Sequence, residues 1–153
     1  MKNFWIKLAA TFFYLGYMPV MPGTFGSLAG LIIFYLIKDY VPIYLTITLF
    51  LLLLGLLLTA GAQEIFQKKD PRFIVIDEVT GMLISFIFVP YDVRLLIIGF
   101  FIFRILDTLK PFPADRLHNL KGGLGVMGDD IVAGIYTNLL LQILARTASF
   151  KIS

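Results

Sequence analysis

Apolar runs separated by short polar segments set the pattern of this sequence. The run 43–62, which no proline interrupts, has twenty consecutive residues without a charge, which is the length of a helix that crosses ~30 Å of membrane hydrocarbon at ~1.5 Å per residue. We expect this helix to continue to about Phe66, because Gln67, Lys68 and Lys69 follow it. The pattern therefore predicts a transmembrane helix over 43–66.

Three further helices are predicted downstream. A proline directly after an aspartate, as at Pro71, is typical of a helix start, and the apolar residues after it continue to Pro90. Pro111 and Pro113 end the following apolar run, because proline cannot continue a helix. The predicted helices run from Asp70 through Val89, over 95–109, and from Asp129 or Asp130 to about Ala145.

The N-terminal apolar stretch is interrupted. No charge occurs over 8–37, yet two prolines and two glycines lie at 19–26, so a single straight spanning helix is not expected. We predict instead an interfacial or re-entrant piece over 8–18 and a membrane-crossing piece over 27–38.

Composition makes a membrane protein the expected class. Hydrophobic residues make up 59% of the 153 residues and charged residues 15%, with a mean hydropathy of +0.89, whereas an ordinary soluble domain is more polar. We therefore predict an all-α fold: a small polytopic membrane helix bundle with about four transmembrane helices and a short N-terminal interfacial or re-entrant helix. No repeat or linker divides the chain, so residues 1–153 are expected to form one domain. The oligomeric state stays open.

Side-chain chemistry excludes several classes of protein. The net charge is +3, but the basic residues are scattered between apolar runs, without the patch or motif of a nucleic-acid-binding protein. The absence of cysteine excludes a disulfide framework, a thiolate nucleophile and a cysteine-bound metal. Because His118 is the single histidine, a metal would have to be held by oxygen atoms.

The basic residues also predict the orientation in the membrane. With the N-terminal segment inside and the chain changing sides at each predicted membrane-crossing segment, eight basic residues lie on the inner side and four on the outer side, as the positive-inside rule requires. The polar segments described below then all approach the cytoplasmic face. The inner group is Lys2, Lys7, Lys68, Lys69, Arg72, Lys110, Arg116 and Lys121, and the outer group is Lys38, Arg94, Arg146 and Lys151.

Charged side chains gather in the stretch 103–130, which holds four of the ten carboxylates. Charge inside an apolar chain is costly and marks functional sites. Arg104 and Asp107 share a helix face, and Lys110 follows near the end of that helix. Asp129 and Asp130 open the last predicted helix, where one of the two could instead be a plain helix cap.

A second acidic pair, Asp77 and Glu78, is expected roughly 10 Å along its predicted helix, below freely solvated loops. Asp77, Gly81 and Ser85 form an i, i+4, i+8 row, a small and polar face on which another helix can pack closely. The alternative to a functional role is that one acid of the pair merely forms an ion pair with Arg104.

The segment PGTFGS at 22–27 combines glycines with two hydroxyl groups. Thr24 and Ser27 are potential N-caps, and a glycine such as Gly26 lets the backbone approach a ligand. An anion cradle at a helix N-terminus is one interpretation, and a plain turn with a helix cap is the other. Lys121, in a glycine-containing connector, adds a further cation that could contact a phosphate.

Clustered carboxylates with almost no histidine suit a hard cation such as Mg²⁺, which prefers carboxylate, water and phosphate oxygens. Arg104 and Lys110 suit the phosphate itself. A membrane site with these groups is expected to act on a phospholipid headgroup or a lipid phosphate, by hydrolysis or by group transfer. The acids concerned are Asp77, Glu78, Asp107, Asp129 and Asp130.

Four segments, PGTFGS, IDEVTGM, FRILDTLKPFP and GGLGVMGDDIVAG, resemble in order and separation the phosphatidylglycerophosphatase A family, over about 12–144. The resemblance implies a magnesium-dependent phosphatase of the bacterial inner membrane that converts phosphatidylglycerol phosphate to phosphatidylglycerol. It implies that the five acids bind metal and catalyse, and that Arg104 and Lys110 handle phosphate. Lys121 stands where some members have histidine, and Ile76 where some have an aromatic residue. The substrate-binding candidates are Thr24, Gly26, Ser27, Arg104, Lys110 and Lys121.

Two rival functions remain for comparison. A CDP-alcohol phosphotransferase also places acids around a divalent metal, but its signature needs an Asp-Gly pair, whereas Asp107 precedes Thr108. A small cation or proton carrier would need acids distributed through the membrane depth. In the phosphatase, Mg²⁺ would polarise the phosphoryl group while a carboxylate activates water, or an aspartyl-phosphate would form. The residues leave this choice open, together with the number of metal ions.

Overall fold

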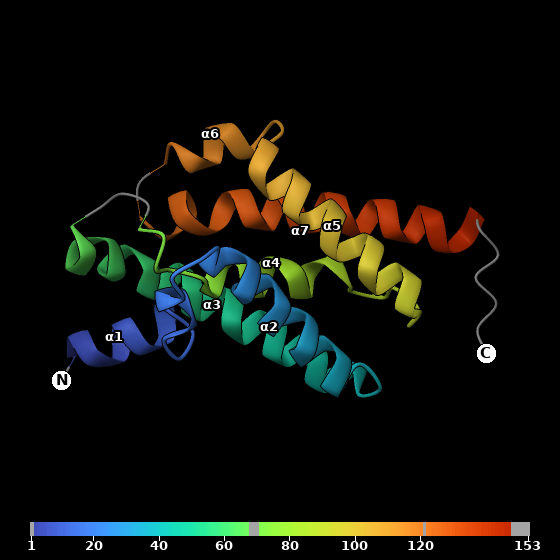
Figure 1. Cartoon of the computed structure of the whole chain (residues 1–153), viewed down its shortest axis with the longest axis horizontal. Helices are drawn as coiled ribbons and strands as arrows, with labels where there is room; N and C mark the ends of the chain where they lie inside the picture. The colour runs from blue at the N-terminus through green and yellow to red at the C-terminus, as the bar shows by residue number, and fades with distance from the viewer. Residues whose placement is uncertain (1, 68–70, 121, 148–153) are drawn as a thin grey trace.

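Residues 2–67, 71–120 and 122–147 are described by the computed structural model, and all regular secondary structure in these ranges is helical (Figure 1). The expected all-α fold is confirmed. In chain order the elements are α1 (Lys2–Ala10), the 3-10 helix η1 (Leu15–Tyr17), α2 (Pro22–Ile37), α3 (Val41–Phe66), α4 (Ile76–Ser85), α5 (Val93–Leu109), α6 (Ala114–His118) and α7 (Gly123–Thr147).

Two of the described helices, α3 with 26 residues and α7 with 25, are long and apolar enough to cross a membrane. Only 22% of the most apolar window of α3 is buried within the protein, against 61% for α7, so α3 lies at the periphery and α7 nearer the centre. Helix α2 is apolar but has 16 residues. The expected count of about four spans therefore stays a prediction.

The outer surface of the bundle carries many large apolar side chains. Examples on four different helices are Ile32, Phe50, Phe101 and Leu139, each more than half exposed. Soluble monomers rarely expose apolar surface on this scale, and a surface of this kind marks a membrane or protein contact. The exposed side chains thus agree with a chain that sits in a membrane.

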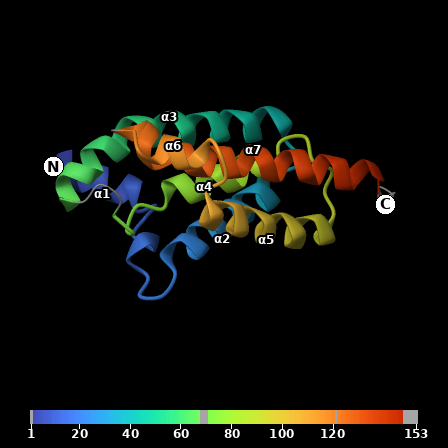
Figure 2. The same cartoon turned by 90° about the horizontal axis from the view of Figure 1, so that it is seen from above.

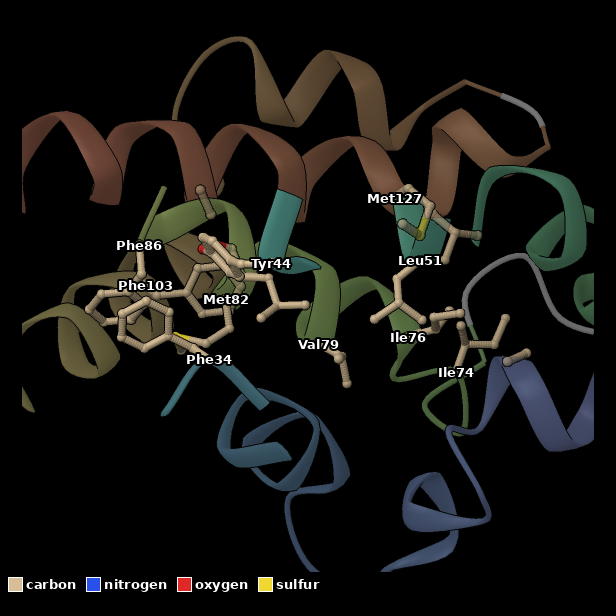
Figure 3. Packing of buried hydrophobic residues seen from close by; sticks show 14 of the residues in the cluster. Phe34, Tyr44, Leu51, Ile74, Ile76, Val79, Met82, Phe86, Phe103 and Met127 are labelled. Atoms are coloured by element: carbon tan, nitrogen blue, oxygen red, sulfur yellow. The ribbon is translucent and has the colours of Figure 1, made fainter. Parts of the chain in front are cut away.

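Helix α4 lies at the centre and packs chiefly against α7 and α2 (Figure 2). Its apolar side chains, including Val79 and Met82, belong to the main core cluster (Figure 3). A Cβ atom on Gly81 would lie 2.8 Å from the backbone oxygen of Asp130, and one on Gly134 would lie 2.6 Å from the backbone oxygen of Gly81. The predicted close packing on the Gly81 face is confirmed.

The start of α4 differs from the sequence prediction. The segment 71–75 is not helical, and Asp77 and Glu78 lie in the first turn of the helix rather than two turns into it. The backbone N–H of Val75 donates to the carbonyl of Ala10 at 3.0 Å, so this segment is bonded to the end of α1 and is not available to a helix. Asp70 lies outside the described residues.

The end of α4 also comes early, at Ser85 rather than Val89. Side chains from neighbouring helices satisfy the backbone carbonyls that this end exposes. Asn138 of α7 donates to the carbonyls of Ser85 at 3.1 Å and Ile87 at 2.8 Å, and the hydroxyl of Tyr44 donates to the carbonyl of Leu83. A half-length helix can therefore end inside the bundle.

Two other helix starts were predicted too late in the sequence. Helix α2 begins at Pro22 rather than Ser27, because a proline, with its fixed φ and no N–H, suits the first helical position. Helix α7 begins at Gly123 rather than at Asp129 or Asp130, directly after Gly122 with φ +75°. The N-terminal piece predicted over 8–18 is instead α1 followed by η1.

The positions of the helix ends separate the predicted inner basic residues from the predicted outer ones. Helix α3 ends and α7 begins toward one end of the molecule, and α5 ends and α6 begins nearer its middle, whereas α2 ends and α3 and α5 begin toward the other end (Figures 1 and 2). Lys110 and Arg116 follow the end of α5, and Lys38 and Arg94 belong to elements at the opposite end. Lys68, Lys69, Lys121 and Lys151 lie outside the described residues.

Candidate active site

A cavity of about 290 Å³ lies between the start of α2, the start of α4, the last turns of α5 and the first half of α7. All five predicted acids line it, together with Arg104 and Lys110. These residues come from α4, α5, the α5 cap and α7, so residues from 77 to 130 meet at one place as the sequence predicted. The acids are Asp77, Glu78, Asp107, Asp129 and Asp130.

Three of the acids form a compact group. Asp107 of α5 and Asp129 and Asp130 of α7 each offer a carboxylate oxygen, and these oxygens all lie within 4.8 Å of one another. Asp129 and Asp130 are both buried, and both lie well inside α7. The alternative that one of them is a helix cap is therefore wrong, because the helix begins six residues earlier than Asp129.

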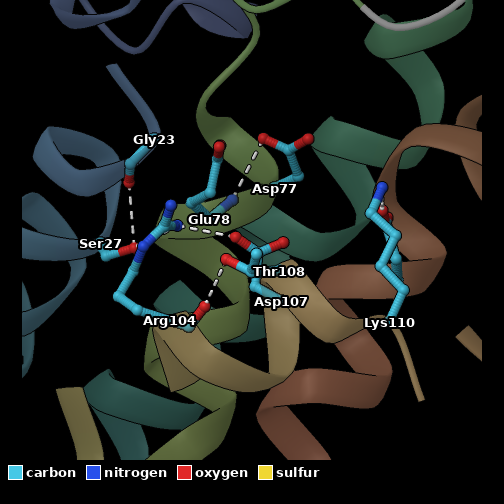
Figure 4. Close-up of polar contacts among 9 residues, drawn as sticks. Gly23, Ser27, Asp77, Glu78, Arg104, Asp107, Thr108 and Lys110 are labelled. Atoms are coloured by element: carbon cyan, nitrogen blue, oxygen red, sulfur yellow. Dashed lines mark hydrogen bonds and ion pairs between the residues drawn. The ribbon is translucent and has the colours of Figure 1, made fainter. Parts of the chain in front are cut away.

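Arg104 is held between α5 and α2 (Figure 4). Its Nη1 lies 2.8 Å from Oδ2 of Asp107, and Nη1 also donates to the hydroxyl of Ser27 at 3.3 Å. The Ser27 hydroxyl in turn donates to the carbonyl of Gly23 at 3.0 Å. Ser27 therefore orients the guanidinium from inside α2, and the ion pair that Arg104 forms is with Asp107.

Lys110 ends α5 and reaches the last helix. It adopts a left-handed backbone conformation with φ 47°, and its N–H donates to the carbonyl of Leu106. Its ammonium lies 2.5 Å from Oδ2 of Asp129. The two predicted phosphate-binding cations thus each contact one acid of the compact group.

Asp77 and Glu78 line the same cavity from the first turn of α4, which is not one of the two candidate spans. Oε2 of Glu78 is buried and accepts no hydrogen bond from the described residues, so it is a buried acceptor with capacity for a ligand.

The start of the PGTFGS segment, rather than its two hydroxyl residues, lines the cavity. Met21, Pro22 and Gly23 line it, whereas Thr24, Gly26 and Ser27 do not. A Cβ atom on Gly23 would lie 2.4 Å from Oε1 of Glu78, so a larger residue at position 23 would displace the Glu78 carboxylate.

The N-cap role predicted for Thr24 and Ser27 is wrong, because both lie inside α2 and Met21 occupies the cap position. A Cβ atom on Gly26 would lie 3.0 Å from the Val75 backbone oxygen, so this glycine allows α2 to pack closely beside the start of α4. Substrate binding by Thr24, Gly26 and Ser27 stays a prediction. Lys121 lies outside the described residues.

Sequence reasoning missed Arg72 as a site residue. It lines the cavity, although it counted above only toward membrane orientation. The sequence feature that could have identified it is a cation five residues before the Asp77-Glu78 pair. The helix predicted from Asp70 argued against this role, because it would have placed Arg72 more than a turn away from the acids.

The electrostatics of the cavity favour a bound cation. Five carboxylates are close together and largely shielded from water, which is costly unless positive charge compensates. Arg104 and Lys110 provide part of this charge. Among the described residues the groups that could hold a metal offer carboxylate oxygens alone, which is the ligand chemistry of a hard divalent cation.

Comparison with known proteins gives the family. The family model for phosphatidylglycerophosphatase A matches residues 8–145. The chain is 37% identical to phosphatidylglycerophosphatase A of Escherichia coli over 95% of this chain and 86% of that protein, and 34% identical to the Haemophilus influenzae protein of the same name over 89% and 86%.

A Bacteroides thetaiotaomicron protein, named provisionally as a phosphatidylinositol-3-phosphatase, is 33% identical over 89% of this chain and 91% of its own length. No solved structure is significantly similar to the chain. The match to the family model covers nearly the whole sequence, including every described acid of the cavity. The chain therefore belongs to the phosphatidylglycerophosphatase A family of phosphatases.

Proposed function

We propose that this chain hydrolyses the terminal phosphomonoester of phosphatidylglycerol phosphate, releasing phosphatidylglycerol and phosphate, in a bacterial inner membrane. The observation that carries the proposal is the compact group of Asp107, Asp129 and Asp130, contacted by Arg104 and Lys110. Acids for a metal and cations for a phosphate thus lie in one cavity. The substrate is taken from two relatives that are named phosphatidylglycerophosphatase A.

Mg²⁺ is the proposed cofactor, and the residues fit it. Asp107, Asp129 and Asp130 would hold the ion, since their oxygens are close together and Oδ1 of Asp130 is buried without a hydrogen-bond donor from the described residues. When bound, Mg²⁺ supplies positive charge that polarises the phosphoryl group. Asp77 and Glu78 line the cavity beside this group and are further candidate ligands.

The chain's own residues have distinct roles in this proposal. Arg104 neutralises charge on the nonbridging phosphate oxygens with its planar, two-donor edge, while Ser27 keeps the guanidinium oriented. Lys110 acts as a second positive charge. A carboxylate outside the compact group, with Glu78 Oε2 as the strongest candidate because it is buried without a donor, accepts the proton of the attacking water.

The proposed test is phosphate release by purified full-length protein. Phosphatidylglycerol phosphate in mixed micelles should yield inorganic phosphate and phosphatidylglycerol when Mg²⁺ is present. Chelation with EDTA should stop the reaction, and added Mg²⁺ should restore it. Turnover that is unchanged in EDTA would exclude the metal, and no phosphate release under any condition would exclude the proposed function.

We also propose that the chain crosses the membrane about four times with the cavity toward the cytoplasm. The described inner-group residues belong to the cavity end and the outer-group residues to the opposite end, which agrees with the positive-inside rule. Arg116→Cys and Arg94→Cys test this in the cysteine-free chain. An impermeant thiol reagent should label the Arg94 variant when applied to the outer face, and the Arg116 variant only after the membrane is opened. The reverse pattern would exclude this orientation.

A further inference from the structure

The cavity contains a third cation that the proposed mechanism does not use. Arg72 lies in the non-helical segment 71–75 between α3 and α4 and lines the cavity beside Asp77 and Glu78. It is an exposed residue, whereas the acids at the base of the cavity are buried. Arg72 therefore stands at the rim, where a ligand enters.

Arg72 differs from the other two cations in its contacts. Arg104 and Lys110 form ion pairs with Asp107 and Asp129, at 2.8 Å and 2.5 Å. Arg72 forms no ion pair with any acid among the described residues. Its charge is thus available to an anion that arrives from outside.

The position of Arg72 is supported by aromatic rings. Its guanidinium carbon lies 5.4 Å from the centre of the Phe73 ring. Phe73 in turn stacks on Tyr17 at 5.0 Å and lies 5.5 Å from Phe66. Tyr17 and Phe66 therefore hold the Phe73 ring against which the guanidinium lies, while the guanidinium keeps donors that can bind a phosphate oxygen pair.

The surroundings of the rim indicate which part of a lipid lies there. The loop before α2 exposes Met18, Val20 and Met21, and Met21 also lines the cavity. Apolar side chains at this edge favour the acyl side of a lipid, while the acids and paired cations lie deeper. A phospholipid with its terminal phosphate in the cavity would place its inner phosphodiester between these two regions.

We propose that Arg72 binds the phosphodiester of the lipid substrate. Phosphatidylglycerol phosphate carries two phosphates joined by glycerol, a terminal monoester and an inner diester, and the inference rests on the proposed function for the monoester. The diester is not cleaved, so Arg72 is a residue of substrate recognition rather than of chemistry. It selects lipids that carry a diester next to the terminal phosphate.

Product inhibition tests this assignment without a second substrate. Phosphatidylglycerol contains the diester alone, and inorganic phosphate resembles the terminal group alone. In mixed micelles, Arg72→Gln should raise KM and the inhibition constant of phosphatidylglycerol at least about tenfold, as expected for the loss of a charged hydrogen bond. The inhibition constant of inorganic phosphate and kcat should change less than about twofold. Arg72→Lys should recover part of the loss.

Arg116 offers a matched control. It also stacks on an aromatic ring, with its guanidinium carbon 4.9 Å from the Phe112 ring centre, but it does not line the cavity. Arg116→Gln should leave all four constants unchanged. Equal weakening of both inhibitors by Arg72→Gln, or no weakening of either, would overturn the role of Arg72 while leaving the proposed function intact. A wild-type protein without phosphate release would overturn the proposed function and this inference together.

Discussion

The two ends of the bundle both have a cavity and charged residues, but they use charge differently. At the end opposite the candidate site, a cavity of about 260 Å³ is lined by Lys38, Asp39 and Tyr91. Lys38 pairs with the adjacent Asp39 at 2.9 Å, and Arg94 pairs with Asp92, two residues away, at 2.9 Å. Each of these charges is thus neutralised by a neighbour in sequence.

At the candidate site the ion pairs are less exposed and one of them joins distant elements. The side chain of Asp129 is 6% exposed and is paired with Lys110 of another element, whereas the side chain of Asp39 is 75% exposed. Exposed pairs between neighbours contribute little to stability. Acids gathered from separate helices are costly to bury, so their presence together indicates a ligand that compensates them.

The comparison is tested most strongly at Asp130. Asp130→Asn keeps the size of the side chain but weakens a hard-cation ligand. We expect kcat to fall at least about a hundredfold, while the melting temperature in EDTA stays the same or rises because a crowded carboxylate is removed. Turnover over an Mg²⁺ titration and melting in EDTA measure the two effects. Asp92→Asn, at the opposite end, is the control and should retain full activity; full activity of Asp130→Asn would remove it from the site.

A smaller effect is expected at Arg104. Arg104→Lys keeps the charge but replaces a planar fork with a point charge. We expect kcat/KM to fall at least about tenfold, or about 1.4 kcal/mol of transition-state stabilisation, with little change in melting temperature. Arg94→Lys should change neither quantity. A variant that melts much earlier but turns over normally while folded would make Arg104 a structural residue.

Packing at the centre gives the third prediction. Gly81→Ala would place a Cβ atom 2.7 Å from Cε2 of Phe103 and 2.8 Å from the backbone oxygen of Asp130. We expect the free energy of unfolding to fall by about 1–3 kcal/mol, as for other overpacked cores. Gly61→Ala, whose Cβ atom would lie 3.4 Å from Cδ1 of Ile6, is the control. Equal melting of the two variants would show that α4 and α7 can separate without cost.

The smallest effect is expected at Asp92, which caps α5 by accepting from the N–H of Arg94 at 2.8 Å. The side-chain hydrogen bond from Arg94 lowers the pKa of Asp92 below its ordinary value of 3.8. The ionised Asp92 carboxylate therefore stabilises the folded protein above about pH 4, and this contribution is lost as the pH falls through the lowered pKa. Asp92→Ala should melt slightly earlier than wild type at pH 6, and the difference should shrink toward pH 3. A difference that grows on acidification would contradict this sign.

The sequence predicted which residues come together more accurately than it predicted where the helices begin. The i, i+3 spacing of Arg104 and Asp107 gave their ion pair, because that contact lies within one helix. The Lys110 and Asp129 pair was expected only as a shared location, since no local pattern encodes a contact between two helices. The start of α4 could not be read from Asp70 and Pro71, because the bond from Val75 to Ala10 depends on tertiary structure.

The same limit explains the role of Arg72. A basic residue outside a regular helix has no periodicity that assigns it a direction. Its place at the cavity depends on the non-helical segment 71–75 and on stacking with Phe73, which in turn stacks on Tyr17 of η1. Contacts between segments more than fifty residues apart thus determine the position of the one charged cavity residue, among those described, that the sequence did not indicate as a site residue.

The short length of α4 has a consequence for how the protein is assembled. Ten residues with two acids in the first turn span only about 15 Å, too little for the insertion machinery to recognise as a span. Longer apolar helices insert first and associate afterwards, and α7, which packs most extensively on α4, is synthesised after it. A ribosome-bound chain that stops before Gly123 should therefore leave α4 open to protease, and a chain that includes α7 should protect it.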